Sequence, residues 1–90
     1  MKQRKIEFTP SFLKVSGKLL KKNPSLKEPL QELLTNLTTD PFTPSLKTHP
    51  LKGKLKGRYA CSLTYDLRVV FKLKNDSVVL IDIGSHDEIY

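Results

Sequence analysis

The sequence has few of the residues that several kinds of functional site require. Its 90 residues include one cysteine, Cys61, and two histidines, His49 and His86. A single cysteine excludes an intramolecular disulfide and a cysteine-based zinc site, and neither histidine belongs to a ligand set at metal-binding spacing. A glycine-rich phosphate loop and a nucleophile elbow are also missing. We therefore expect a protein with neither a bound metal nor a cofactor.

Long apolar runs are absent as well. No segment approaches membrane-spanning length, and the N-terminal MKQRKIEF lacks the apolar region of a secretion signal. We expect a cytoplasmic protein that makes no use of a membrane. Cys61 lies in an alternating apolar stretch, which favours a small buried hydrophobe over a reactive thiol.

Acidic residues are missing from a long central window. Residues 41–65 carry five Lys or Arg and no Asp or Glu, in a chain with 16 basic and nine acidic residues. Such a concentration of positive charge suits a polyanion, most commonly nucleic acid, although a solvated lysine-rich surface would also explain it. The spacing by two would align three lysines on one side of an extended segment. The candidate phosphate-binding residues are Lys52, Lys54, Lys56 and Arg58.

Two amphipathic helices are predicted in the first half of the chain. Thr9 is the expected N-cap of the first, with Pro10 at its first position, and the Asn-Pro pair at 23–24 ends it. Ser25 and Glu28 have the spacing of a capping box at the start of the second. Each helix has one apolar stripe, and the short break between them predicts an antiparallel pair.

Alternating residues predict four strands, separated by turn-forming segments. The Asn75-Asp76 pair predicts a hairpin between the last two strands, the chain is expected to leave the sheet at Gly84, and residues 41–50 are expected to form a loop. This order predicts one α+β domain over residues 1–90: a short N-terminal strand, a helix pair, and a three-stranded antiparallel meander, with the helices packed on one face of the sheet. The predicted strands are 4–8, 59–65, 68–74 and 77–83.

The two histidines lie beside basic or turn-forming segments rather than in an apolar pattern. His49 precedes the basic stretch, and His86 follows the last predicted strand. Cleavage of RNA by its own 2′-hydroxyl needs a base, cations that stabilise the charged phosphorane, and an acid for the leaving oxygen. The residue types are compatible with this chemistry, and by themselves they only suggest it.

Two longer stretches, HPLKGKLKGRYACSLTYDLRVVFKL and VVLIDIGSHDEIY, resemble the RelE/ParE superfamily of bacterial toxins, and within it the YafQ-like branch. The resemblance covers essentially the whole chain. It implies a compact α+β toxin of a type II toxin–antitoxin system that inhibits translation. Such toxins cleave mRNA in the ribosomal A site without metal and are held inactive by a cognate acidic antitoxin.

The resemblance also implies roles for five residues. His86 would be the main proton-transfer group, with His49 and Asp66 assisting. Arg68 lies where RelE-like toxins place an arginine that contacts phosphate, and Tyr90 takes the place of the terminal aromatic residue.

The chain departs from the YafQ-like pattern at three positions. Ser62 replaces a histidine, Asp82 replaces an arginine, and Leu67 replaces a tryptophan. Loss of a cation at the phosphate should weaken transition-state stabilisation unless Arg68 or Lys54 supplies the charge. The departures leave open whether the chain cleaves RNA as the family does, cleaves it weakly, or only binds it.

Two alternatives come from other functional classes. One is a ParE-like toxin that binds a protein target such as DNA gyrase and cleaves nothing. The other is a basic nucleic-acid-binding module without catalysis. Histidines at both expected positions favour the endoribonuclease, and we expect its acidic antitoxin to lie across the sheet and the Lys52–Arg58 stretch.

Overall fold

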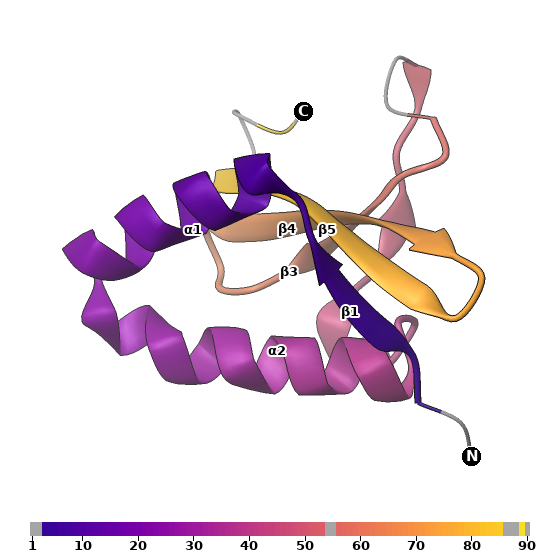
Figure 1. The fold of residues 1–90 in the computed structure, drawn as a ribbon, viewed down its shortest axis with the longest axis horizontal. Coiled ribbons are helices and arrows are strands. Elements are labelled where there is room, and N and C mark those ends of the chain that lie inside the picture. Colours follow the sequence, from indigo (N-terminus) through magenta and orange to yellow (C-terminus); the bar gives the residue numbers. More distant parts are fainter. Residues whose placement is uncertain (1–2, 54–55, 86–88, 90) are drawn as a thin grey trace.

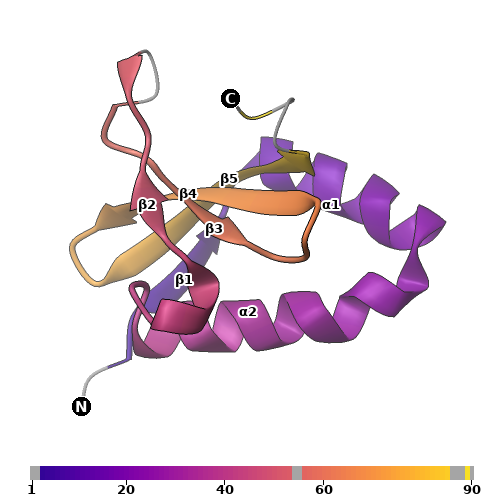
Figure 2. The ribbon, with the colours of Figure 1, turned by 180° about the vertical axis from the view of Figure 1, so that it is seen from behind.

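Two helices lie on one face of a five-stranded sheet, as predicted for an α+β chain (Figure 1). The computed structural model describes residues 3–53, 56–85 and 89, and Figure 2 gives the view from behind. The strand order is β1-β5-β4-β3-β2. The elements are β1 (Lys5–Phe8), α1 (Pro10–Lys22), a 3₁₀ turn (Pro24–Leu26), α2 (Lys27–Thr39), a second 3₁₀ turn (Pro44–Leu46), β2 (His49–Pro50), β3 (Tyr59–Ser62), β4 (Leu67–Lys74) and β5 (Ser77–Ser85).

Strand β1 confirms the predicted N-terminal strand and pairs with β5 in parallel, whereas the other pairs are antiparallel. The helix pair therefore forms the first part of the long chain segment that connects β1 to β5. Each helix is 13 residues long, and no helix in the described part of the chain is long and apolar enough to cross a membrane.

Helix α1 begins where the sequence predicts. The Thr9 hydroxyl oxygen accepts a hydrogen bond from the amide of Phe12 at 3.2 Å, which is the expected N-cap contact. The same hydroxyl donates to the carbonyl of Leu80 in β5 at 2.8 Å. One side chain thus both starts the helix and ties its first turn to the sheet.

The predicted capping box of the second helix is wrong. Ser25 lies inside the 3₁₀ turn, α2 begins at Lys27, and its N-cap residue Leu26 makes no side-chain cap hydrogen bond. The turn starts at Pro24, and the amide of Leu26 already donates to the carbonyl of Asn23 at 3.0 Å. An N-cap residue must lie before the first turn, so Ser25 cannot take that role here.

The sheet has one strand more than predicted. His49 and Pro50 form β2, which pairs with β3 at the edge of the sheet, where a proline is tolerated (Figure 2). Strand β3 ends at Ser62 instead of continuing to Tyr65, and β5 continues past Gly84 to Ser85. The predicted hairpin is confirmed, with Asn75 at a positive φ of 51°.

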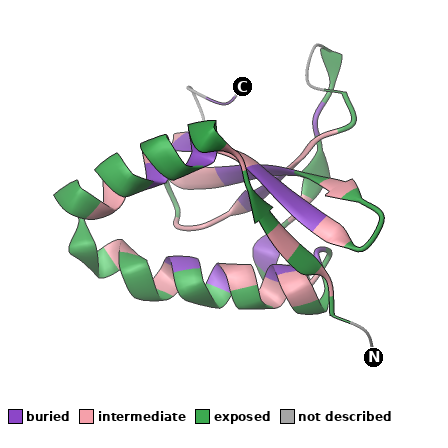
Figure 3. Ribbon diagram, viewed as in Figure 1, coloured by how far each residue is buried: buried purple, intermediate pink, exposed green. Residues whose placement is uncertain are grey.

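The main core lies between the helices and the sheet. Its fully buried side chains come from both layers, and Figure 3 shows the buried segments turned toward each other. A smaller cluster lies on the other face of the sheet. The largest side chains of the main core are Phe12, Leu37, Leu80 and Phe71. The smaller cluster consists of Leu51, Ala60, Val70 and Ile89, with Ile81 packed against it.

A β-bulge in β5 lets this strand serve both clusters. Val70 pairs with Asp82 and Phe71 pairs with Leu80, so Ile81 is an extra residue without a partner. Leu80 and Ile83 consequently both pack in the main core although they are three residues apart, whereas Ile81 contacts the smaller cluster.

Replacing Thr9 by alanine should lower the free energy of unfolding by about 1–2 kcal/mol, because it removes the N-cap bond together with the link to β5. Urea denaturation measures this. Thr35→Ala is the matched control: Thr35 lies inside α2, and its exposed hydroxyl donates only to the carbonyl of Gln31 at 3.0 Å. Since alanine favours the helix, the control should change stability by less than about 0.5 kcal/mol. Equal losses in both variants would contradict the special role of Thr9.

Candidate functional site

The face of the sheet away from the helices carries a row of side chains that includes His49. In antiparallel pairs, directly opposite residues point to the same face. His49 lies opposite Ala60, Ala60 opposite Val70, and Val70 opposite Asp82. Since Ala60 and Val70 belong to the smaller cluster, this row lies on the open face. Three strand spacings place the Cα atoms of His49 and Asp82 about 14 Å apart.

A second row lies two residues further along the same face. Ser62 is opposite Arg68, and Arg68 is opposite Gly84. Two strand spacings and two residues of rise place the Cα atoms of His49 and Arg68 about 12 Å apart. His49 in β2 and Arg68 in β4 lie on the same face, on either side of β3. The open face therefore holds an imidazole and a guanidinium at a spacing suited to one extended substrate.

His49 has a contact that involves its ring nitrogen Nδ1. His49 is exposed, and its Nδ1 lies 3.3 Å from the carbonyl oxygen of Lys47. A carbonyl only accepts hydrogen bonds, so Nδ1 carries the proton in this contact.

Arg68 has a structural contact that the sequence did not predict. Its Nη1 donates to the carbonyls of Thr64, Tyr65 and Leu67 at 2.9, 3.1 and 3.1 Å. These bonds hold the turn between β3 and β4, in which Asp66 is exposed. A guanidinium has five N–H donors, so Nε and Nη2 are still able to bind a phosphate.

An open pocket of about 400 Å³ lies beside this turn. Its wall combines hydroxyl groups with two cationic side chains, and only one aliphatic side chain takes part. The lining residues are Ser45, Lys47, Ser62, Leu63, Thr64, Tyr65 and Arg68. Such a lining is suited to a polar, negatively charged ligand.

The basic stretch does not form the extended row that the sequence suggests. Gly53 and Gly57 have φ angles of 67° and 93°, and the amide of Lys56 donates to the carbonyl of Gly53 at 3.1 Å. The backbone is therefore turned at Gly53 and Gly57, so the described lysines Lys52 and Lys56 do not belong to one extended segment. Lys52 and Lys56 are exposed on this loop, which extends away from the sheet in Figures 1 and 2.

Three of the predicted site residues lie outside the described residues: Lys54, His86 and Tyr90. Their neighbours in sequence are described. Ser85, which precedes His86, pairs with Leu67 beside Asp66. Ile89, which precedes Tyr90, is buried in the smaller cluster on the open face. Ser85 therefore lies beside the turn, and Ile89 lies on the face that carries His49 and Arg68.

Cys61 takes no part in the site. Its side chain is completely buried in the main core, and burial raises the pKa of its thiol to about 12, more than the positive charge of Arg68 lowers it. A thiol in this state is not a nucleophile at neutral pH. The structure thus confirms the interpretation of Cys61 as a buried hydrophobe.

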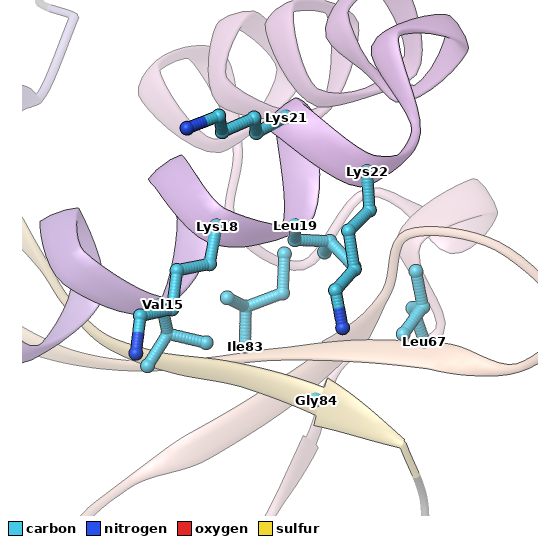
Figure 4. A pocket seen from close by; sticks show the side chains of 8 residues that line it. All are labelled: Val15, Lys18, Leu19, Lys21, Lys22, Leu67, Ile83 and Gly84. Carbon is cyan, nitrogen blue, oxygen red and sulfur yellow. The ribbon is translucent and has the colours of Figure 1, made fainter.

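A second pocket, of about 330 Å³, lies on the helix side of the sheet. In Figure 4 the side chains of Lys18 and Lys22 reach down from α1 on either side of Ile83. Its other lining residues are Val15, Leu19, Lys21, Leu67 and Gly84. The lysines of this pocket carry the same charge as those of the basic loop but lie on the opposite side of the sheet from the predicted site.

A family model described as "Bacterial toxin of type II toxin-antitoxin system, YafQ" matches residues 4–90. The chain belongs to the YafQ family of bacterial toxins. This agrees with the resemblance noted in the sequence, and the fold is the YafQ/RelE fold. A comparison with curated protein sequences gave no match.

Solved structures of similar proteins cover nearly the whole chain. YafQ from E. coli strain BL21(DE3) is 27% identical, with 98% of this chain and 99% of that chain covered and a TM-score of 0.81. A chain of the E. coli DinJ-YafQ toxin-antitoxin complex is 29% identical, with 98% of both chains covered and a TM-score of 0.80. A metal-bound toxin from Helicobacter pylori is 37% identical, with 97% and 99% covered and a TM-score of 0.80. Within residues 3–53, 56–85 and 89, this YafQ-family chain has no group of three or more His, Cys, Asp or Glu that could hold a metal.

The raised pKa of Cys61 has a consequence for stability at high pH. Below pH 9 the thiol is neutral in both states; between pH 9 and about 12 it ionises only in the unfolded chain. The free energy of unfolding should therefore fall across this window. Urea midpoints at several pH values measure the fall, and Cys61→Ala is the control because it keeps the titrating lysines and tyrosines. A slope that is equally steep in Cys61→Ala would contradict the assignment.

Proposed function

We propose that this YafQ-family toxin is an endoribonuclease that cleaves mRNA in the ribosomal A site. The observation that carries the proposal is the open face of the sheet. It presents His49 and Arg68 about 12 Å apart, beside the turn that exposes Asp66, with a basic loop at its edge. A proton-transfer group, a cation and a phosphate-binding loop are the parts that cleavage by a 2′-hydroxyl needs.

The proposed reaction needs only acid–base chemistry. A base takes the proton of the 2′-hydroxyl, its oxygen attacks the adjacent phosphorus, and the bond to the 5′-oxygen breaks as an acid protonates that oxygen. The products are a 2′,3′-cyclic phosphate and a 5′-hydroxyl. His86 is the main proton-transfer group of this proposal, with His49 and Asp66 assisting and Tyr90 as the terminal aromatic residue. Because no step calls on a metal, toxin that is treated with EDTA and then freed of the chelator should cleave mRNA on ribosomes as fast as untreated toxin.

Arg68 is the proposed source of positive charge at the phosphate. Asp82 stands where the family pattern has an arginine, but its Oδ1 accepts a hydrogen bond from the amide of Ile83 at 2.8 Å. That bond directs the carboxylate toward the strand. Arg68 lies opposite Gly84, which has no side chain to cover the guanidinium. This arrangement supports the proposal that Arg68 supplies the positive charge that the family pattern places at the position of Asp82.

The proposed partner is an acidic antitoxin that covers the open face and the Lys52–Arg58 loop. The DinJ-YafQ complex is a precedent for such pairing in a similar protein. Action on ribosomes would place the toxin in the cytoplasm. A toxin that only binds DNA gyrase would give no role to His49 and Arg68 on the same face of the sheet. No specific feature of the described residues favours that alternative.

Replacing His86 by alanine should lower the rate of mRNA cleavage on programmed ribosomes by about 10²–10⁴-fold, because a positioned acid or base contributes this much. Growth arrest on induction should disappear in parallel. Retained binding of the antitoxin, measured by co-purification, is the control for folding. A variant that is as toxic as the parent would rule out the assignment.

Replacing Lys52, Lys54 and Lys56 together by glutamine should weaken binding to ribosomes and make it less dependent on salt. For each phosphate that a lysine no longer neutralises, the slope of log affinity against log salt should become shallower by about one. The matched control replaces Lys18, Lys21 and Lys22 by glutamine, which removes the same charge from the opposite side of the sheet. Equal effects in the two triple variants would mean that only net charge matters.

A further inference from the structure

Tyr65 is the most exposed large apolar side chain in the described part of the molecule. Its relative exposure is 93%, against 47% for Phe8, 49% for Phe42 and 56% for Leu13. Phe8 and Phe42 each pack against another aromatic ring at 5.9 and 5.4 Å, whereas Tyr65 has no aromatic neighbour among the described residues. The fold therefore gains little from this ring, and the face of the ring is accessible to a ligand.

The backbone that presents Tyr65 is held firmly. Its own carbonyl accepts a hydrogen bond from Arg68, and so does that of Thr64 before it. Across the turn, the amide of Leu63 donates to the carbonyl of Leu67 at 2.9 Å, and the amide of Leu67 donates to the Thr64 hydroxyl at 3.2 Å. A ring on a preorganised turn loses little entropy when it binds, because the backbone is already in place.

The surroundings of the ring indicate the chemical class of its ligand. Tyr65 lines the pocket of about 400 Å³ together with the cationic side chains of Lys47 and Arg68, and no acidic side chain is among the described residues that line it. Leu63 is the single aliphatic residue, and the others carry hydroxyl groups. An interface pocket for a protein side chain would be mainly apolar. An aromatic face beside cations and hydroxyls suits a nucleotide, with the base on the ring and its phosphate at the cations.

We propose that Tyr65 binds single-stranded RNA by stacking on a nucleobase next to the cleaved phosphodiester. The inference rests on the proposed function, because Arg68 lines this pocket and also lies on the same face of the sheet as His49. It adds a binding residue that the sequence analysis did not identify, because the alternating pattern places Tyr65 in a strand. Tyr65 contacts the substrate through its ring, so the ring and not the hydroxyl carries the effect.

The test uses the full chain with His86→Ala to block cleavage, and a short RNA that contains 2-aminopurine. Stacking on Tyr65 should quench the fluorescence of 2-aminopurine. Tyr65→Ala should lower the affinity about 5- to 150-fold, which corresponds to about 1–3 kcal/mol for one base on an aromatic ring. The salt slope should not change, because the variant keeps every cation that faces a phosphate. Tyr65→Phe should bind like the parent.

Leu13→Ala is the matched control, because Leu13 is also exposed but lies on α1. Unchanged urea midpoints would show that the variants fold. An affinity of Tyr65→Ala equal to that of the parent overturns the role of Tyr65 and leaves the proposed function standing. A parent chain that binds no RNA and cleaves none overturns both. Loss of antitoxin binding with RNA binding intact would make Tyr65 a protein contact and also overturn the proposal.

Discussion

The β-bulge at Ile81 is the constraint on which both faces of the sheet depend. If Ile81 paired with Val70 in a regular ladder, the alternation along β5 would continue unbroken, and Arg68 would lie opposite Ile83 instead of Gly84. Ile83 would then cover the guanidinium on the open face, and Asp82 would point into the main core. Burial of an unpaired carboxylate there would be costly. One inserted residue thus keeps the core apolar and the space around Arg68 open.

The helices stabilise the sheet from one side only, which leaves the other side for binding. Thr9 links the first turn of α1 to β5, and Phe12 and Leu37 fill the space between the layers. Among the described residues, the open face has the smaller cluster of Leu51, Ala60, Val70 and Ile89. Because that cluster includes Ile89, packing on the open face also holds this residue near the end of the chain.

The turn between β3 and β4 joins structure to the proposed function. Arg68 holds the turn through Nη1, and its other N–H groups are still able to bind a ligand. Replacing Arg68 would therefore disturb both the turn and the proposed phosphate contact. Tyr65 and Asp66 are exposed on that turn, beside the pocket that Lys47 lines. A single cation therefore positions the residues that would contact RNA and would also neutralise its phosphate.

Local sequence determined the parts of this protein that depend on near neighbours. The cap at Thr9, the helix stripes, the Asn75 turn and the burial of Cys61 all follow from spacing within a few residues, and the resemblance to YafQ-like toxins came from the chain alone. Only the tertiary structure decided the rest. β2 is too short to show a pattern and exists because β3 offers it a partner. Tyr65 continues the alternation of β3, yet the strand ends at Ser62, because Ser62 pairs with Arg68 of β4 and the residues between them form the connecting turn. These outcomes depend on contacts between strands, and sequence spacing carries no information about such partners.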